Sequence, residues 1–366
     1  MRQATEIFDI TVDMLATSEA PPVPHTDPEL LRQAAAFDDK LIHQLHEGPA
    51  SIHLATSKVS RATGLLAAHK TFCLDTLRSK QPSELYVEPQ SIADAYGLPE
   101  LWQGAKNVLK EEVTRYKVET QHPDIPEPLQ QPVSLAETKS LLRFMWDRVV
   151  QPRETPSVNV YMTDQPQNYH VFWAPTASNL DYATPTAYSR ATQLSFDLPH
   201  NATHLAHLDV LQKADGVHRY KDSMPQRAFF EAATVLSEYI TMETAAHGAE
   251  FGEELLRVMN LEGSMTADEL SKWVVADRMY EFKLRAVRLY ADVLMLEGRP
   301  FEDTVQHISE EFGIPHEQTA AETAKYLPWT GLGGVYTYGY RKLLAEQKYT
   351  LDEVFYDTKG QPRENW

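Results

Sequence analysis

The residues with the clearest chemical potential are three histidines, His200, His204 and His207, which follow Pro199 in a predicted helix. His200 and His204 stand at i and i+4, so their imidazoles lie on one helix face, a turn apart. The H-E-x-x-H zinc motif uses this separation to bring two nitrogens onto one metal ion. Asn201 stands where the glutamate of that motif would act as general base, and a carboxamide cannot take a proton at neutral pH. The pattern is therefore half of a metalloprotease motif.

A metal held by two histidines needs a third ligand, usually a carboxylate from a neighbouring helix. Glu231 and Glu238 lie on a predicted amphipathic helix, residues 229–242, at positions i and i+7 that can face the same way. His200, His204 and Glu231 would offer two nitrogens and one oxygen, a set that suits zinc and also non-haem iron. We predict one divalent metal, zinc ahead of iron. The alternative is a polar helix face that binds no metal.

A second group of charged residues could bind a substrate. Arg285, Arg288 and Asp292 stand at i, i+3 and i+7 on the long helix predicted to open at a capping box, residues 266–269. If this face is buried, a guanidinium there would hold a substrate carboxylate. If it is exposed, Arg288 and Asp292 would form an i,i+4 ion pair worth less than about 1 kcal/mol.

A segment rich in glycine and tyrosine, residues 331–339, follows near the C-terminus. Glycine lets a backbone approach a ligand closely, and a phenol such as that of Tyr336 can donate to a developing oxyanion. The segment does not follow a predicted strand, which disfavours a phosphate-binding loop. On spacing alone, a flexible surface loop is the favoured interpretation.

The composition limits the class of partner and the compartment. A formal charge of -18, from 52 acidic and 34 basic residues, disfavours nucleic acid and anionic membranes as partners. Cys73 is the only cysteine, so no intrachain disulfide can form. Residues 1–17 lack the pattern of a signal peptide, and no apolar run is long enough to span a membrane. We expect a cytoplasmic protein that acts on a small-molecule substrate; its oligomeric state is left open.

Hydrophobic periodicity predicts a mostly α fold. Among the helices it indicates are residues 57–80 and 98–117, and a capping box at residues 134–137 opens another. We predict one composite helical domain over residues 1–366. Its parts are an N-terminal helical part, a hairpin and connection, and a C-terminal helical part that carries the site: residues 1–152, 153–199 and 200–366.

The β structure is predicted to be one small hairpin. Val158, Val160 and Met162 alternate with polar residues, residues 163–168 resemble a turn, and residues 169–173 have strand-like composition.

Four sequence blocks in residues 195–345 keep a characteristic order and internal spacing. They resemble a bacterial family catalogued as domain of unknown function 885, a helical metallopeptidase-like group akin to the Taq-type carboxypeptidases. The family's H-E-x-x-P-G-H-H-x-Q block is matched by His200, Asn201, His207, Leu208 and Asp209. Its E-G-W-A-x-Y-x-E and R-A-x-R-x-x-x-D blocks resemble residues 231–238 and 285–292. Its fourth block, E-x-x-R-Y followed by P-G-Q-A-x-x-Y-x-x-G, resembles residues 322–326 and 330–339.

The departures from the family pattern fall on polar positions of the expected site. The family's catalytic glutamate is Asn201, its Pro-Gly is His204-Leu205, and the proline and glutamine of the last block are Thr330 and Leu332. The resemblance therefore implies a rebuilt site on a helical metallopeptidase-like scaffold rather than an ordinary peptidase.

From these residues we expect a metal-dependent enzyme that acts on a small amide, amino acid or peptide-like metabolite by hydrolysis, elimination or cyclisation. His200, His204 and Glu231 would bind the metal, and Glu238 or His207 would move the proton in place of the glutamate that Asn201 replaces. Tyr336 would donate to the oxyanion, and the substrate would be held by Arg285, Arg288, Asp292 and Tyr338. Two alternatives stay open: a non-haem iron oxidative enzyme with the same ligands, and a metal-free pseudopeptidase.

Overall fold

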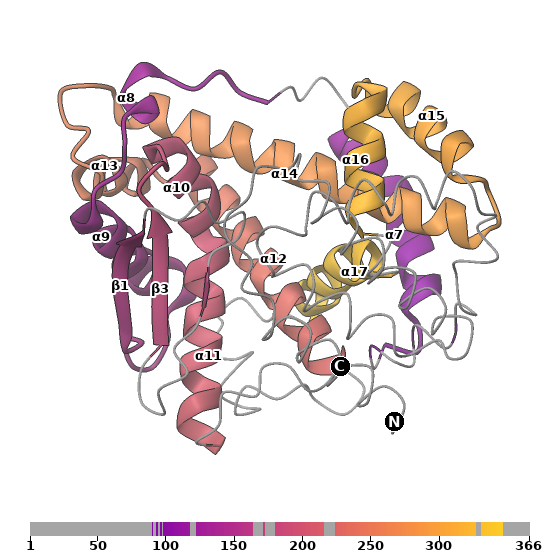
Figure 1. Cartoon of the computed structure of the whole chain (residues 1–366), viewed down its shortest axis with the longest axis horizontal. Helices are drawn as coiled ribbons and strands as arrows, with labels where there is room; N and C mark the ends of the chain where they lie inside the picture. The colour runs from indigo at the N-terminus through magenta and orange to yellow at the C-terminus, as the bar shows by residue number, and fades with distance from the viewer. Residues whose placement is uncertain are drawn as a thin grey trace, which may run out of the picture. The chain divides into compact units, whose positions relative to one another are not determined.

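The structure, a computed structural model, is mostly helical, which confirms the predicted fold class (Figure 1). It describes residues 90, 93, 96, 98–117, 122–163, 171–172, 180–215, 224–326 and 331–346. Within these residues, no helix combines the length and the apolar composition needed to cross a membrane. The α-helices are α7 (Leu101–Tyr116), α8 (Glu127–Gln130), α9 (Leu135–Met145), α10 (Arg190–Phe196), α11 (Ala202–Asp215), α12 (Met224–His247), α13 (Ala249–Val258), α14 (Ala267–Leu296), α15 (Phe301–Phe312), α16 (His316–Tyr326) and α17 (Leu332–Ala345).

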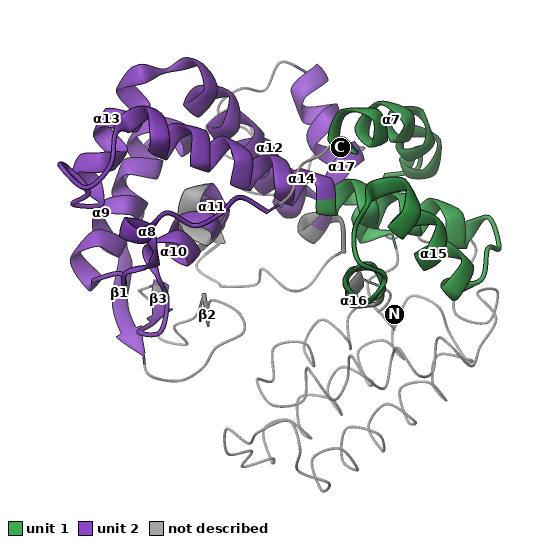
Figure 2. Ribbon diagram, turned by 90° about the horizontal axis from the view of Figure 1, so that it is seen from above, with its two compact units in different colours: residues 1–118, 284–335 green, residues 119–283, 336–366 purple. Residues whose placement is uncertain are grey.

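The described residues belong to two compact units, each built from two separate stretches of the chain (Figure 2). Unit 1 comprises Met1–Val118 and Leu284–Val335, and unit 2 comprises Glu119–Lys283 and Tyr336–Trp366. The candidate metal ligands all belong to unit 2. The single composite domain with three sequential parts stays a prediction, and the helix expected at residues 57–80 lies outside the described residues.

Both predicted capping boxes are present. The Ser134 side chain accepts a hydrogen bond from the Glu137 amide, and the Ser134 amide donates to Glu137 Oε2 at 2.8 Å. Thr266 and Glu269 make the same reciprocal pair at the start of α14. Each box satisfies donors that the first turn of a helix leaves without an intrahelical partner. The helix starts that carry these signals are therefore set by local sequence.

The β structure differs from the predicted hairpin. Strands β1 (Val158–Thr163) and β2 (Val171–Phe172) both exist, but each pairs with a third strand, β3 (Leu180–Pro185), in the order β1-β3-β2. β1 runs parallel to β3 and β2 antiparallel to it. The direct pairing of β1 with β2 is wrong because β3 was missed. Tyr182, Ala183 and Thr184 of β3 are all buried, so these positions do not alternate between a buried and an exposed face, and Pro185 ends the strand.

The helices that carry the histidines follow β3 directly. Helix α10 is followed by a π-helix, η2 (Asp197–Asn201), and then by α11. Both η2 and α11 pack against α12 (Figure 1). A buried cluster of Leu180, Leu208 and Phe230 joins β3, α11 and α12. The Thr203 hydroxyl donates to Ser237 Oγ at 2.8 Å, so the two helices approach closely at small polar residues. This contact fixes the distance between the histidines and the acids of α12.

Candidate metal centre

His200 lies in a π-helix, whereas His204 lies in the α-helix that follows. The sequence predicted an uninterrupted helix, and the structure places the wider turn of η2 at Asp197–Asn201. Pro199 has no amide hydrogen to donate to the helical ladder, which disfavours regular α geometry at this point. The Thr203 hydroxyl lies 3.0 Å from the Pro199 carbonyl oxygen, but its one hydrogen points to Ser237 Oγ, so Pro199 shares that hydrogen at most. Turns of this kind are rare in proteins, and those that occur are often found at functional sites.

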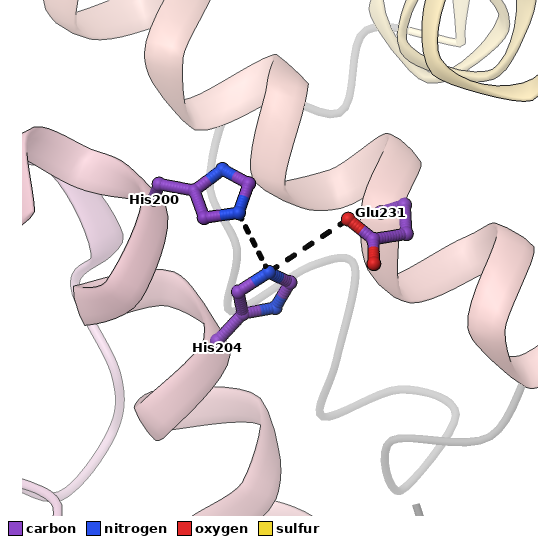
Figure 3. Close-up of side chains that lie close together, drawn as sticks. All are labelled: His200, His204 and Glu231. Atoms are coloured by element: carbon purple, nitrogen blue, oxygen red, sulfur yellow. Dashed lines mark hydrogen bonds and ion pairs between the residues drawn. The ribbon is translucent and has the colours of Figure 1, made fainter. Parts of the chain in front are cut away.

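The three predicted metal ligands lie together (Figure 3). His204 Nε2 is 3.1 Å from His200 Nε2 and 3.8 Å from Glu231 Oε2. One donor atom from each residue lies within 4.8 Å of the others, and among the described residues this is the one such group. His204 and Glu231 are buried, with 4% and 6% of their surface exposed. Three elements of unit 2, η2, α11 and α12, thus bring two nitrogens and one oxygen close together.

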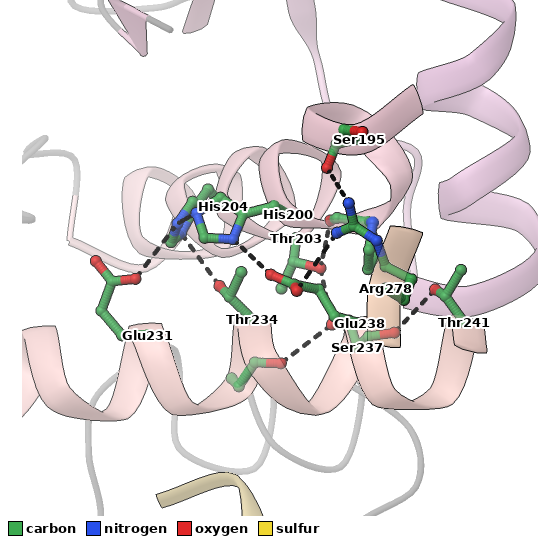
Figure 4. Close-up of polar contacts among 12 residues, drawn as sticks. Ser195, His200, Thr203, His204, Glu231, Thr234, Ser237, Glu238, Thr241 and Arg278 are labelled. Atoms are coloured by element: carbon green, nitrogen blue, oxygen red, sulfur yellow. Dashed lines mark hydrogen bonds and ion pairs between the residues drawn. The ribbon is translucent and has the colours of Figure 1, made fainter. Parts of the chain in front are cut away.

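The far nitrogen of each ring has a partner that fixes its tautomer, assigned here from the hydrogen bonds (Figure 4). His200 Nδ1 lies 2.8 Å from Glu238 Oε1, and a carboxylate only accepts, so this nitrogen carries the proton. His204 Nδ1 lies 3.2 Å from the Thr234 hydroxyl. That hydroxyl donates its one proton to the Phe230 carbonyl at 2.8 Å and must accept from His204. If both rings are neutral in these tautomers, the two Nε2 atoms present lone pairs to each other; a hydrogen bond between them at 3.1 Å requires one ring to take the other tautomer or a second proton.

Two lone pairs and a carboxylate at these distances repel one another unless a cation lies among them. Two imidazole nitrogens bound to one tetrahedral zinc ion, each about 2.0–2.1 Å from it, are separated by roughly 3.3 Å. The observed separation of 3.1 Å between the Nε2 atoms is close to this value. The donor types, the tautomers and the spacing all fit a divalent metal.

Phe230 holds the ring of His204 from one side. The two rings stack with centroids 4.0 Å apart and an angle of 27° between their planes. His207 is fully buried and packs on the same phenyl group at 4.4 Å. It is not part of the metal-binding group, although it extends the same histidine pattern in the sequence. Its role in proton transfer stays a prediction.

Asn201, which replaces the glutamate of the zinc motif, points toward the sheet. Its Nδ2 donates to the hydroxyl of Tyr182 in β3 at 3.1 Å, and Gln193 Nε2 lies 3.4 Å from the same oxygen. The side chain is buried, with 2% exposed. Asn201 therefore links η2 to β3, a contact that an ionised glutamate could not make as a donor.

Sequence reasoning missed the residues that orient the ligands. Thr234 stands at i+3 from Glu231 and lies on the same face of α12, a spacing that could have revealed it. Arg278 approaches Glu238 from α14, with Nη1 3.4 Å from Oε2. No local pattern marks Arg278, because its partner is distant in sequence and the contact depends on how α12 and α14 pack.

In unit 1, the predicted substrate-binding residues make structural contacts. Arg288 Nε donates to Glu322 Oε2 at 2.9 Å, so its partner lies on α16. Asp292 accepts a hydrogen bond from the Gly334 amide at 3.3 Å, at the start of α17. Arg285 is buried as well. Arg288 and Asp292 of α14 therefore contact α16 and the start of α17, and substrate binding by Arg285, Arg288 and Asp292 stays a prediction.

The glycine-rich segment forms a helix, and its interpretation as a surface loop is wrong. Leu332–Ala345 is α17, and a Cβ on Gly333 would lie 2.7 Å from the Arg288 carbonyl group. Glycine is required here because the backbone of α17 approaches that of α14 too closely for a side chain. Tyr336 is buried in this helix and Tyr338 is half-buried. Their predicted contacts with substrate stay predictions.

Asp292 should make the stability of the protein depend on pH. Burial raises the pKa of its carboxyl to about 7, against hydrogen bonds from Gly331, Gly334 and Gly333 that lower it. The folded state then holds a proton that the unfolded state releases near pH 4, so stability falls as pH rises from about 4 to 7. Between pH 4 and 7, Asp292→Asn should reduce the slope of the unfolding free energy against pH by up to about 1.4 kcal/mol per pH unit. Urea unfolding at a series of pH values measures this slope.

The matched control for this experiment is Asp303→Asn, an exposed acid in the first turn of α15. It should leave the slope between pH 4 and 7 as it is in the unmodified protein. An unchanged slope in Asp292→Asn would show that the carboxyl of Asp292 ionises in the usual range.

Fold and site together define a mostly helical protein with a centre of two histidines and one carboxylate, in which His204 and Glu231 are buried and the side chain of His200 is 29% exposed. The sequence matches no protein-family model and no curated protein. Among solved structures, a protein from Colwellia psychrerythraea described as a lipoprotein is 17% identical, with a TM-score of 0.37; the match covers 98% of this chain. The chain spans about half of that protein, 52% of its length.

A second similar structure is the carboxypeptidase of Pyrococcus furiosus in its Apo-Mg form. It is 11% identical, with a TM-score of 0.46, and the match covers 100% of this chain and 78% of the other. Neither likeness assigns an activity to this chain. The resemblance to the family of domain of unknown function 885 rests on the sequence blocks alone.

Proposed function

We propose that this protein is a metal-dependent enzyme that binds one divalent metal through His200 Nε2, His204 Nε2 and Glu231. The observation that carries the proposal is the grouping of one ligand atom each from His200, His204 and Glu231 within 4.8 Å of one another. Glu238 and Thr234 contact the Nδ1 atoms of the two rings. A bound metal would supply Lewis-acid polarisation of a carbonyl oxygen, with zinc as the first candidate.

The substrate that we propose is a small amide, amino acid or peptide-like metabolite, processed by hydrolysis, elimination or cyclisation. Ordinary peptide hydrolysis is disfavoured because Asn201 has no basic group and its amide is directed to Tyr182. Glu238 is also poorly suited to act on a substrate, since one oxygen accepts from His200 and the other lies near Arg278. We therefore propose an orienting role for Glu238 and keep His207 as the candidate proton carrier.

A non-haem iron enzyme is the second candidate. Two histidines and one carboxylate are the ligand set of iron oxygenases, whose chemistry requires no carboxylate base next to the metal. The engagement of Asn201 with Tyr182 favours this candidate over a conventional hydrolase.

Metal analysis of protein purified without chelator tests the proposal directly. The expected result is close to one transition metal per chain, and its identity decides between zinc and iron. Protein that carries no metal and takes up neither zinc nor iron on dialysis would contradict the proposal. The metal-free pseudopeptidase would then account better for the site.

A further inference from the structure

A buried charged network lies behind His200, on the side away from the metal-binding group (Figure 4). It consists of Glu238 from α12, Asp277 and Arg278 from α14, and Ser195 from α10. Glu238, Arg278 and Asp277 expose 0%, 2% and 4% of their surface. Removing charges this deeply from water is unfavourable, so the network lowers the stability of the fold unless its members are well paired.

The guanidinium of Arg278 is held from several directions. Its Nη2 donates to the Ser195 carbonyl oxygen at 2.7 Å, and its Nε donates to Asp277 Oδ2 at 3.2 Å. The Ser195 hydroxyl donates to the other oxygen of Asp277 at 2.9 Å. Nη2 donates to Asp277 Oδ2 as well, so one carboxylate oxygen and one carbonyl oxygen hold the planar guanidinium at two of its nitrogens and leave it little freedom to rotate. The remaining nitrogen, Nη1, is thereby directed to Glu238 Oε2 at 3.4 Å.

The charge of Arg278 is permanent. Burial opposes it, but the carboxylates of Asp277 and Glu238 outweigh burial and raise the pKa of the guanidinium above its usual range. Glu238 therefore has a fixed cation on one side and the Nδ1 hydrogen of His200 on the other. A carboxylate held at both oxygens cannot turn away from the imidazole.

We propose that Arg278 is a positioning residue of the metal centre: by fixing Glu238, it directs His200 Nε2 toward the metal. The proposal rests on the proposed function, because it requires a metal at His200, His204 and Glu231. Outer contacts of this kind orient metal ligands, and their loss typically lowers metal affinity by about 10- to 100-fold. A buried charged network adds little to folding stability, since apolar residues of similar size often stabilise a protein as much or more. A role in positioning a ligand gives a reason for its presence.

The effect should be confined to one ligand. The partner of His204 Nδ1 is the neutral hydroxyl of Thr234, which takes no part in the contacts of Arg278. Loss of Arg278 should therefore loosen His200 and leave His204 and Glu231 in place. The site should bind metal more weakly and with altered geometry, without losing it.

The test uses the full chain with Arg278→Gln, and with Arg278→Lys as a variant that keeps the charge and one donor. Zinc affinity is measured by competition with a chromophoric chelator, and geometry by the visible spectrum of the cobalt(II)-substituted protein. We expect about 10- to 100-fold weaker zinc binding and a changed cobalt spectrum for Arg278→Gln. Arg278→Lys should recover part of the affinity.

The matched control is Arg190→Gln, which breaks a second ion pair of unit 2, Arg190 to Glu137 at 2.8 Å. Because this pair joins α10 to the start of α9, its loss should lower stability and leave zinc affinity and the cobalt spectrum unchanged. If Arg278→Gln does not fold, Glu238→Gln tests the same link with an isosteric side chain.

The outcomes separate the two proposals. If the unmodified protein binds one metal and the Arg278 and Glu238 variants match it in affinity and spectrum, the positioning role is refuted and the proposed function stands. If the unmodified protein binds no metal, both are refuted. If Arg190→Gln weakens zinc binding as much as Arg278→Gln, the effect is one of stability and the positioning role is refuted.

Discussion

Replacement of His204 by alanine is expected to abolish stoichiometric metal binding. His204 Nε2 is the central donor, 3.1 Å from His200 Nε2 and 3.8 Å from Glu231 Oε2, so its loss leaves one nitrogen and one oxygen. The drop in affinity should exceed the roughly 10- to 100-fold expected when only an outer contact is removed. Zinc titration with a competing chelator, together with metal analysis after dialysis, measures it.

His247→Ala is the control for this experiment. His247 lies on the helix that carries Glu231, but its side chain is 77% exposed at the far end of α12. The control should keep one metal per chain. Retention of one tightly held zinc ion by His204→Ala would place the metal elsewhere and would overturn the assignment of the site.

Replacement of Gly333 by alanine is expected to destabilise the protein by about 1–3 kcal/mol, the usual cost of forcing extra atoms into a packed interior. The new Cβ would lie 2.7 Å from both the carbonyl carbon and oxygen of Arg288. Neither helix can yield easily, because the atoms in contact are backbone. Urea unfolding followed by circular dichroism gives the change in free energy.

The neighbouring glycine supplies a matched comparison. A Cβ on Gly334 would meet Leu101 Cδ1 at 3.5 Å and Trp102 at 3.6 Å, which are ordinary packing distances. Because alanine favours a helix over glycine by about 0.5–1 kcal/mol, Gly334→Ala should be neutral or stabilising. Equal effects of the two substitutions would mean that α17 does not approach α14 as closely as described.

The histidine pair of the candidate site could be predicted because its signal is local. His200 and His204 follow a spacing that any helical turn would bring together. Glu231 could be named only as an acid on a nearby helix, because residues 228–238 are buried on every face and its approach to the histidines depends on how α12 packs against η2 and α11. The capping residues Ser134 and Thr266 likewise act on their own helices. Residues within a few positions of each other on one helix have few alternative arrangements, so sequence alone restricts them strongly.

The remainder depends on contacts between distant segments. Strand β3 lacks alternation because it is buried, and the pairing partner of β1 cannot be read from a run of apolar residues. Arg278 and Glu322 are ordinary charged residues until α14 meets α12 and α16. For the glycine segment the spacing favoured a surface loop, and only the close packing of Gly333 against the Arg288 backbone explains why glycine stands in a helix there.

The wide turn at Asp197–Asn201 also changes the phase between the helices that it joins. Each residue of an α-helix advances by about 100° around the axis, so one extra residue in a turn rotates everything before it by that angle relative to everything after it. Ser195 can therefore contact α14 while His204 contacts α12. In a regular α-helix without the wide turn, residues 195 and 204 would not be related by this rotation. Deletion of one residue from this turn would rotate α10 relative to α11 by about 100°. Ser195 could then no longer contact Arg278 while His204 stays beside Glu231.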